Sequence, residues 1–325
     1  MRSRLPLLWF ALVILLTAAV YARAGEAGGG ATLYVPVMRA TRTDGLGLEV
    51  VPDYTHNQPN LSDIAPVYMR STFGSQVDPY YGPYQKYLSG GWAAVDLKFE
   101  VLDDWRALGA QPLVVFMHGG LPCKVPTLAQ LATYGDFIVA AVERYDLHTF
   151  EVANEPDTSG GYPSLFGCWG KAYADRLIYL LDYVQARVPS HRQVGVSFQA
   201  GSLAQFAMLA ATASHADWIG LHYYPVFGGG VVQYPWPGGL TELVEMAGAY
   251  SDDVRVTEFN LREPDEVCGA AFEQAQAGEI QAALDLGLPM LSILVYYPAW
   301  DWQCTGIQGT LSEAALLPGA GYPGP

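Results

Sequence analysis

Two glutamates of this 325-residue chain follow short β-rich runs and carry the groups that acetal hydrolysis needs. Glu155 stands in the tripeptide Asn-Glu-Pro, and Glu258 stands in Thr-Glu-Phe. Cleaving an acetal requires a proton on the leaving oxygen and a nucleophile on the opposite side. Two carboxyl groups about 5 to 5.5 Å apart supply both, with retention of configuration. Either tripeptide alone is a weak signal, so the prediction depends on whether the fold brings the two glutamates together.

Seven short apolar runs recur along the chain, with amphipathic segments between them. The runs cover residues 67–70, 113–117, 147–155, 193–198, 218–224, 254–259 and 291–297. Strand, helix and strand repeated at this spacing predict right-handed crossovers and a parallel sheet. An eighth strand upstream, at residues 33–38 or 46–51, completes a closed (β/α)8 TIM barrel of the α/β class.

Helical periodicity appears between these runs. One segment contains Val95, Phe99 and Leu102 and stops at Gly109, and a later one covers residues 173–184. Residues 127–144 begin with Thr and have Gln three positions later, which predicts a capping box at the start of a helix. Residues 40–64 show no clear helix, so the first unit of the barrel is the least defined.

Proline marks the carboxyl ends of three predicted strands, directly after Glu155, Tyr224 and Tyr297. Proline lacks an N–H group and cannot continue a strand ladder. In a barrel of this kind the active site lies at the carboxyl ends of the strands. We therefore expect Glu155, after the fourth strand, and Glu258, near the end of the seventh, at this lip.

With these positions the chain resembles the retaining glycoside hydrolases of clan A, barrel enzymes with catalytic glutamates after strands four and seven. The resemblance covers about residues 68–302 and is to family 39 or to related β-glucanase and cellulase families. It implies that Glu155 is the acid/base and Glu258 the nucleophile of an enzyme acting on β-linked oligo- or polysaccharide. It implies no cofactor and no metal.

The resemblance also implies a set of sugar-binding residues. Asn154 would hydrogen-bond the sugar 2-hydroxyl, and Tyr224 would donate to Glu258 and hold it ionised. The other residues expected in the pocket are Arg70, His118, His222 and Trp300, the last as its apolar floor.

Several neighbouring residues are assigned structural roles or loop positions. Glu151 is expected to be a buried, paired acid deeper along the fourth strand, and Asp157 and Asp301 to be solvated in lip loops. The tyrosines at 80, 81, 84 and 87 are expected in a loop at the cleft, where rings can stack on sugars. The Gly-rich segment 227–239 is a candidate mobile lid.

Four cysteines, Cys123, Cys168, Cys268 and Cys304, follow strands three, four, seven and eight. They fit no metal-binding spacing, and three pairings are possible. Because adjacent strands lie side by side, we expect disulfides between the first two and between the last two cysteines.

The composition favours an exported, folded protein. The chain is 51% apolar, and its 17 Lys and Arg against 32 Asp and Glu give a net charge of −15, which disfavours nucleic acid as a partner. In residues 1–24, arginines at positions 2 and 4 precede an apolar run and a small-residue cleavage pattern, which together predict a signal peptide. The run is also long enough for an uncleaved membrane anchor. Residues 25–31 are expected to be a flexible leader, 32–317 a single catalytic domain, and 318–325 a flexible tail.

Two other functions are compatible with the sequence. His118, His222, Glu155 and Glu258 could be the ligands of a metal-dependent barrel hydrolase, since imidazole and carboxylate suit zinc or manganese. A catalytically inactive, sugar-binding barrel is the third possibility. Oligomeric state and the identity of the sugar cannot be predicted from the sequence.

Overall fold

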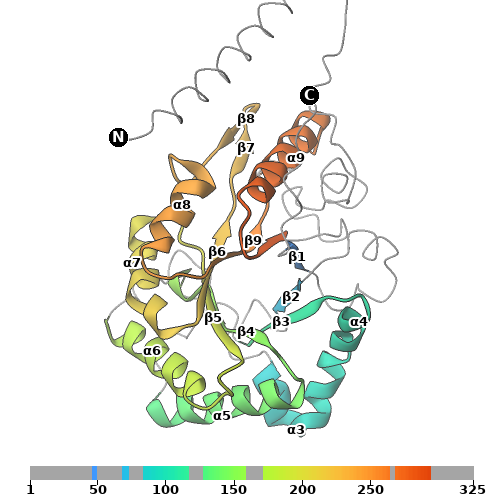
Figure 1. The fold of residues 1–325 in the computed structure, drawn as a ribbon, viewed down its shortest axis with the longest axis vertical. Helices are drawn as coiled ribbons and strands as arrows, with labels where there is room; N and C mark the ends of the chain where they lie inside the picture. The colour runs from blue at the N-terminus through green and yellow to red at the C-terminus, as the bar shows by residue number, and fades with distance from the viewer. Residues whose placement is uncertain are drawn as a thin grey trace, which may run out of the picture. The chain divides into compact units, whose positions relative to one another are not determined.

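The computed structural model describes residues 46–49, 68–72, 83–116, 127–158, 171–263 and 268–293. Eight parallel strands in these ranges form a closed barrel, in the order β1, β10, β9, β6, β5, β4, β3 and β2, with β1 paired to β2 (Figure 1). They are β1 (Leu46–Glu49), β2 (Tyr68–Thr72), β3 (Gln111–Val115), β4 (Thr149–Asn154), β5 (Gln193–Phe198), β6 (Trp218–Tyr223), β9 (Val254–Phe259) and β10 (Leu291–Ile293). The predicted (β/α)8 TIM barrel is confirmed.

Each predicted apolar run supplies one of these strands. Of the two candidates for the first strand, residues 46–51 contain β1, whereas 33–38 lie outside the described residues. The remaining two strands, β7 (Val226–Gly228) and β8 (Val231–Gln233), form a separate antiparallel hairpin after β6.

Helices surround the barrel (Figure 1). In the described ranges they are α3 (Pro83–Phe99), α4 (Val101–Ala107), α5 (Leu128–Arg144), α6 (Lys171–Gln185), α7 (Leu203–Thr212), α8 (Gly239–Gly248) and α9 (Ala270–Asp285), with short 3-10 turns η2 (Pro156–Thr158) and η4 (Ala213–His215). The predicted capping box starts α5: Gln130 N donates to Thr127 Oγ1 over 3.2 Å, and Thr127 N donates to Gln130 Oε1 over 2.9 Å. Gly109, with φ 82°, lies just beyond α4 as expected for a helix stop.

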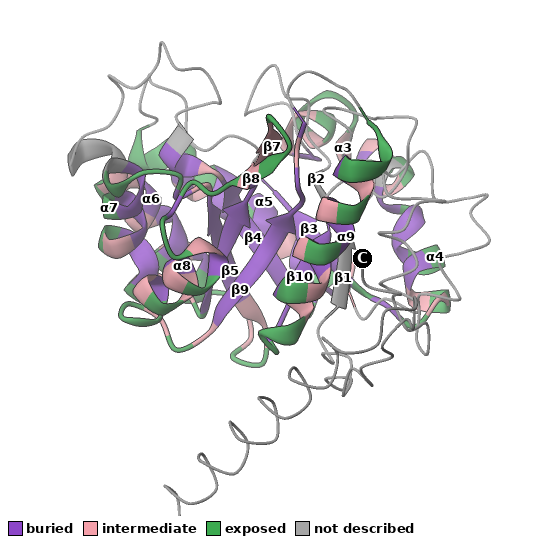
Figure 2. Cartoon of the chain, turned by 90° about the horizontal axis from the view of Figure 1, so that it is seen from above, coloured by how far each residue is buried: buried purple, intermediate pink, exposed green. Residues whose placement is uncertain are grey.

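The alternation of side chains along the strands divides the core into two parts. Outward-facing residues such as Val114 belong to the large cluster that the helices cover, while Leu113, Trp218 and Met290 form a separate cluster inside the barrel. Figure 2 shows the buried strands at the centre and the exposed outer faces of the helices. Gly195 is required beside Trp218, because a Cβ at this position would overlap the indole ring.

No helix in the described ranges is long and apolar enough to cross a bilayer. The predicted signal peptide or anchor (1–24), the leader (25–31) and the tail (318–325) lie outside the described residues, and so these three assignments stay predictions.

Candidate active site

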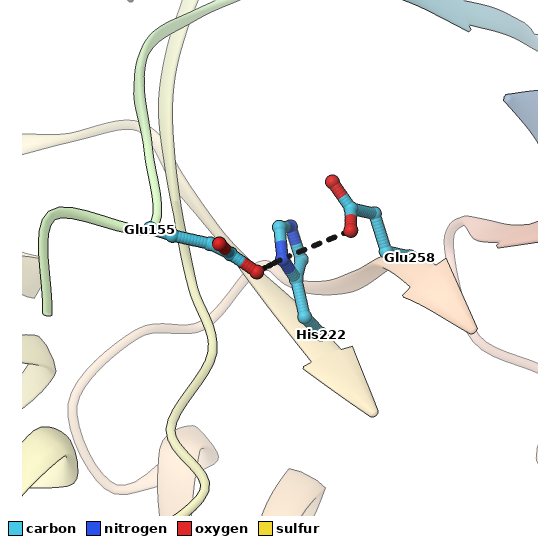
Figure 3. A group of neighbouring side chains, drawn as sticks. All are labelled: Glu155, His222 and Glu258. Carbon is cyan, nitrogen blue, oxygen red and sulfur yellow. Dashed lines mark hydrogen bonds and ion pairs between the residues drawn. The ribbon is translucent and has the colours of Figure 1, made fainter. Parts of the chain in front are cut away.

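Glu155, His222 and Glu258 meet at the carboxyl ends of the barrel strands (Figure 3). The Nδ1 atom of His222 lies 2.8 Å from Glu155 Oε1 and 3.3 Å from Glu258 Oε2. One oxygen of each glutamate and one nitrogen of His222 all lie within 4.8 Å of one another. The two glutamates point toward each other from β9 and from the end of β4, with the imidazole between them. The structure therefore brings together the two acids that the sequence singled out.

A β-bulge in β4 turns Asn154 toward the barrel interior. Between Glu151 and Ala153 the register of β4 against β5 slips by one residue, so that Val152 has no opposite partner. Arg70 Nη2 donates to both Glu151 Oε2 and Asn154 Oδ1, which shows that these two side chains share the inner face. In a regular strand, residues three positions apart would face opposite sides.

A second bulge does the same for Glu258 in β9. His222 pairs with Glu258, but the preceding residue of β6 pairs with Val256, which leaves Thr257 as the extra residue. Thr257 Oγ1 donates to Ser197 Oγ over 2.9 Å inside the barrel. Thr257 and Glu258 therefore both face the interior, although they are neighbours in the chain.

The backbone of Glu155 lies in the left-handed region, with φ 49°. This conformation is uncommon outside glycine and costs about 1 to 3 kcal/mol. Glu155 also precedes a proline, and its N–H donates to the carbonyl of Ser197 over 2.7 Å. The surrounding structure therefore holds Glu155 in a strained turn that aims its side chain at His222.

Arg70 is fully buried and connects three acidic or amide side chains. Its Nε donates to Glu151 Oε1 over 2.6 Å, and its Nη1 donates to Glu258 Oε1 over 2.6 Å. Glu151 is also fully buried, which confirms the prediction of a buried, paired acid. Two carboxylates thus share one guanidinium, and Arg70 fixes Glu258 and Asn154 in relation to each other.

Glu258 is held as a carboxylate. Burial alone would raise its pKa, but the nearby charges of His222 and Arg70 and the hydrogen bonds from Tyr224 and Arg70 outweigh burial and lower the pKa to about 2. Tyr224 donates to Glu258 Oε2, the contact that the resemblance implied. Glu258 is therefore a buried carboxylate held by Arg70, His222 and Tyr224.

His222 lies between the two glutamates, which favour its protonated form. Burial opposes its protonation, but the charges of Glu258 and Glu155 and the hydrogen bond to Glu155 outweigh burial and raise its pKa. Its Nε2 atom is buried and has no hydrogen-bond partner among the residues that the structure describes. The Nδ1 atom of the imidazole thus links the two glutamate side chains.

The structure corrects the assignment of Asp157. This side chain is fully buried rather than solvated, and it accepts hydrogen bonds from Gln199 N over 3.0 Å and Ala200 N over 2.7 Å. Burial raises the pKa of Asp157 to about 7, although the two backbone N–H groups act in the opposite direction. The sequence shows no signal for this burial, because the partners come from the loop after β5.

Arg262 is a further residue near the site, and the sequence analysis did not predict it. Its guanidinium lies over the ring of Tyr224, 4.7 Å from the ring centroid. Burial lowers the pKa of Arg262, while Tyr224 and Glu155 act in the opposite direction. It lies three residues beyond the end of β9, and no local pattern marks it.

The segments predicted as cleft loops form a helix and a hairpin in part. Tyr84 and Tyr87 belong to α3 and pack against Phe137, so they are not cleft residues. The Gly-rich segment starts with the β7–β8 hairpin, whose two-residue turn has positive φ at Gly229 (62°) and Gly230 (81°). These glycines allow the tight turn, so they do not by themselves indicate a mobile lid.

Some predicted residues lie outside the described part of the chain. They are Tyr80, Tyr81, His118, Cys123, Cys168, Trp300, Asp301 and Cys304. Cys268 is disulfide-bonded, and every other cysteine of the chain lies outside the described residues. The expected pairing of the four cysteines therefore stays a prediction.

The Glu155, His222 and Glu258 group has the donor types and the spacing that a divalent cation can use. One feature opposes a cation there: the Arg70 guanidinium already neutralises Glu258.

No protein-family model matches the sequence, and no curated protein matches it either. Among solved structures, xylanase B from Clostridium stercorarium F9 is similar, with 13% identity, a TM-score of 0.55, and coverage of 84% of this chain and 96% of that chain. The GH51 α-L-arabinofuranosidase from Thermotoga petrophila RKU-1 has 12% identity and a TM-score of 0.55, over 85% of this chain and 69% of that chain. The β-glycosidase from Thermosphaera aggregans has 13% identity and a TM-score of 0.53, over 83% and 91%. At these identities the similarity is one of fold, the barrel that the sequence predicts.

Proposed function

We propose that this chain is a retaining glycoside hydrolase that acts on β-linked oligo- or polysaccharide. One observation carries the proposal: a carboxylate oxygen of Glu155 lies within 4.8 Å of one from Glu258, at the lip of the barrel. An inverting enzyme separates its carboxyl groups by about 6.5 to 9.5 Å to admit a water molecule between them and the sugar. The shorter separation favours direct attack by a carboxylate.

The reaction would proceed in two displacements. In the first, a Glu258 oxygen bonds to the anomeric carbon, the glycosidic C–O bond breaks, and Glu155 transfers its proton to the leaving oxygen. In the second, Glu155 removes a proton from water, the water oxygen bonds to the anomeric carbon, and Glu258 leaves as a carboxylate. The two inversions give net retention.

The surroundings of the two glutamates suit these different roles. Glu258 is ionised because Arg70, His222 and Tyr224 stabilise its charge. Glu155 Oε1 lies 2.8 Å from His222 Nδ1, and the Glu155 side chain is 18% exposed, so it can meet both a leaving group and water. Glu258 is thus held in place as a carboxylate, whereas Glu155 is accessible to substrate and water.

Asn154 would bind the sugar beside the bond that breaks. Arg70 donates to its Oδ1 atom, which orients the amide so that its NH2 group is the donor toward a sugar hydroxyl. A hydrogen bond of this kind to the 2-hydroxyl strengthens as the transition state gains oxocarbenium character. His222, His118 and Trp300 are proposed as further sugar-binding residues.

The similar structures support a carbohydrate substrate. Their names describe a xylanase, an α-L-arabinofuranosidase and a β-glycosidase, and the first and third favour a β-linked substrate. Which sugar this chain takes depends on loops at the barrel mouth, because the strands that hold the two glutamates are common to the fold.

A metal-dependent hydrolase is the second candidate, because Glu155, His222 and Glu258 can converge on one ion. Chelation separates the two functions. If activity persists after prolonged dialysis against EDTA and is not raised by zinc or manganese, the metal-dependent function is excluded. A sugar-binding protein without activity would bind oligosaccharides but hydrolyse none of the glycosides in the panel below.

The decisive test is to trap the covalent intermediate. A panel of aryl β-glycosides identifies the sugar, and the matching 2-deoxy-2-fluoro glycoside with an activated leaving group should then inactivate the enzyme by labelling Glu258. Peptide mass mapping locates the label, and proton NMR of an unlabelled reaction should show the β-anomer as the first product. An α-anomer, or a label on another residue, would overturn the proposal.

We also propose that the protein is exported, with residues 1–24 as a signal peptide or anchor, and that disulfides join Cys123 to Cys168 and Cys268 to Cys304. Mass mapping of the secreted protein under non-reducing conditions tests both statements. A bond between Cys123 and Cys268 would contradict the pairing.

A further inference from the structure

Three hydrogen bonds join the turn from Glu155 to Asp157 to the end of β5 and the loop that follows it. Glu155 N donates to the carbonyl of Ser197 over 2.7 Å, and the two oxygens of Asp157 accept from Gln199 N over 3.0 Å and Ala200 N over 2.7 Å. Asp157 uses a separate oxygen for each N–H group. The turn that carries Glu155 is therefore attached to a neighbouring strand at both of its ends.

Two residues of this connection have left-handed backbones. Glu155 and Ala200 both have φ 49°, and neither is a glycine. Ala200 is also fully buried, and its carbonyl accepts from Trp236 Nε1 over 2.9 Å. Conformations of this kind persist only where the surroundings hold them, and such strain collects at functional sites.

We propose that Asp157 is the positioning residue for Glu155. By holding the N–H groups of Gln199 and Ala200, it keeps the turn at Pro156 in the form that presents the Glu155 carboxyl group to the leaving oxygen. Trp236 extends this support to the segment after the β7–β8 hairpin. This inference rests on the proposed function, because it assumes that Glu155 is the general acid.

A positioning role predicts a specific kinetic signature. Poor leaving groups, such as an alkyl alcohol or a sugar, need protonation as the C–O bond breaks, whereas 2,4-dinitrophenolate does not. A misplaced general acid therefore slows only the first class, and displacements of about 1 Å can cost about a hundredfold. Loss of folded enzyme alone would lower the rates with both classes of leaving group equally.

The test compares kcat/KM for a 2,4-dinitrophenyl glycoside and for an alkyl glycoside of the same sugar, in the wild type and three variants. In Asp157→Asn, whose amide keeps one acceptor oxygen, we expect kcat/KM for the alkyl glycoside to fall about 10- to 100-fold, and for the dinitrophenyl glycoside less than about threefold. Trp236→Phe keeps an aromatic ring but removes the hydrogen bond to the Ala200 carbonyl, so it should show the same pattern more weakly. Asp217→Asn is the matched control, because Asp217 also accepts from a backbone N–H group, that of Val194 over 2.8 Å, but at the amino end of β5.

A Glu155→Ala variant separates failure of the positioning role from failure of the proposed function. If Glu155→Ala discriminates strongly between the two leaving groups and Asp157→Asn does not, the positioning role is wrong and the proposed function stands. If Glu155→Ala itself does not discriminate, the assignment of the general acid fails, and the inference falls with it. If Asp157→Asn is too unstable to purify, Trp236→Phe decides: an equal effect on both leaving groups rejects the positioning role.

Discussion

Tyr224 donates a hydrogen bond to the same Glu258 oxygen, Oε2, that lies 3.3 Å from His222 Nδ1. The adjacent Tyr223 has a buried hydroxyl that finds no hydrogen-bond partner within the described part of the chain. The two tyrosines are neighbours in the chain, but only Tyr224 acts on the proposed nucleophile. They offer a matched pair of variants.

Tyr224→Phe should raise the pKa of Glu258, because it removes one of the interactions that lower this pKa to about 2. The activity requires ionised Glu258, so the acidic limb of the kcat/KM profile should move to higher pH, and the plateau should fall about 10- to 100-fold. Tyr223→Phe should leave the profile unchanged. An acidic limb that stays at the wild-type position in Tyr224→Phe would contradict this role.

Glu258→Ala should lower the turnover of aryl glycosides by about 10⁴-fold or more, the scale on which removal of a catalytic group acts in other hydrolases. Added azide should restore activity and give a glycosyl azide of inverted configuration, because the small anion occupies the space of the missing carboxylate. Near wild-type turnover without any added anion would refute the nucleophile assignment.

Glu155→Ala should retain kcat/KM for dinitrophenyl glycosides and lose about 10² to 10⁴-fold for alkyl glycosides, because general acid catalysis contributes on that scale. In the second displacement Glu155 acts as the base, so azide should accelerate the dinitrophenyl substrate and yield a glycosyl azide of retained configuration. The product is identified by NMR. Azide products with the same configuration in both variants would mean that the two roles are not divided in this way.

Glu151→Gln should destabilise the protein by about 3 kcal/mol, because it breaks a fully buried ion pair with Arg70 and leaves buried charge less well compensated. Asp103→Asn is the control, since the Asp103 side chain in its ion pair with Arg106 is 87% exposed and should contribute under about 1 kcal/mol. Urea denaturation of both variants measures the difference. If both variants lost the same free energy of unfolding, the buried ion pair between Glu151 and Arg70 would contribute no more than an exposed one.

Asp157 should make the stability depend on pH between about 4 and 7. Its pKa is raised from 3.8 to about 7, so the folded state binds its proton more tightly than the unfolded state does. This contribution to the free energy of unfolding is complete below about pH 4 and is lost as pH rises through 7, by about 4 kcal/mol at most. Asp157→Asn should flatten this slope in urea titrations across that range, and identical slopes would contradict the raised pKa.

The sequence determined the barrel and the positions of the two glutamates. Seven short apolar runs, separated by segments with helical periodicity, predicted seven of the barrel strands. The Thr127 capping box predicted the start of α5. Prolines after strands placed Glu155 and Tyr224 at the lip. These signals are local, since propensity, capping and the missing N–H of proline act within a few residues.

How these residues meet depends on tertiary packing. The bulges at Val152 and Thr257, which turn Asn154 and Glu258 inward, depend on the register of the neighbouring strands. Arg70 contacts Glu258 across 188 positions of the chain. The burial of Asp157 depends on N–H groups in another loop, and so its type and position predicted a solvated acid. Register, burial and shared charges are properties of packed neighbours, and a single sequence does not specify which neighbours those are.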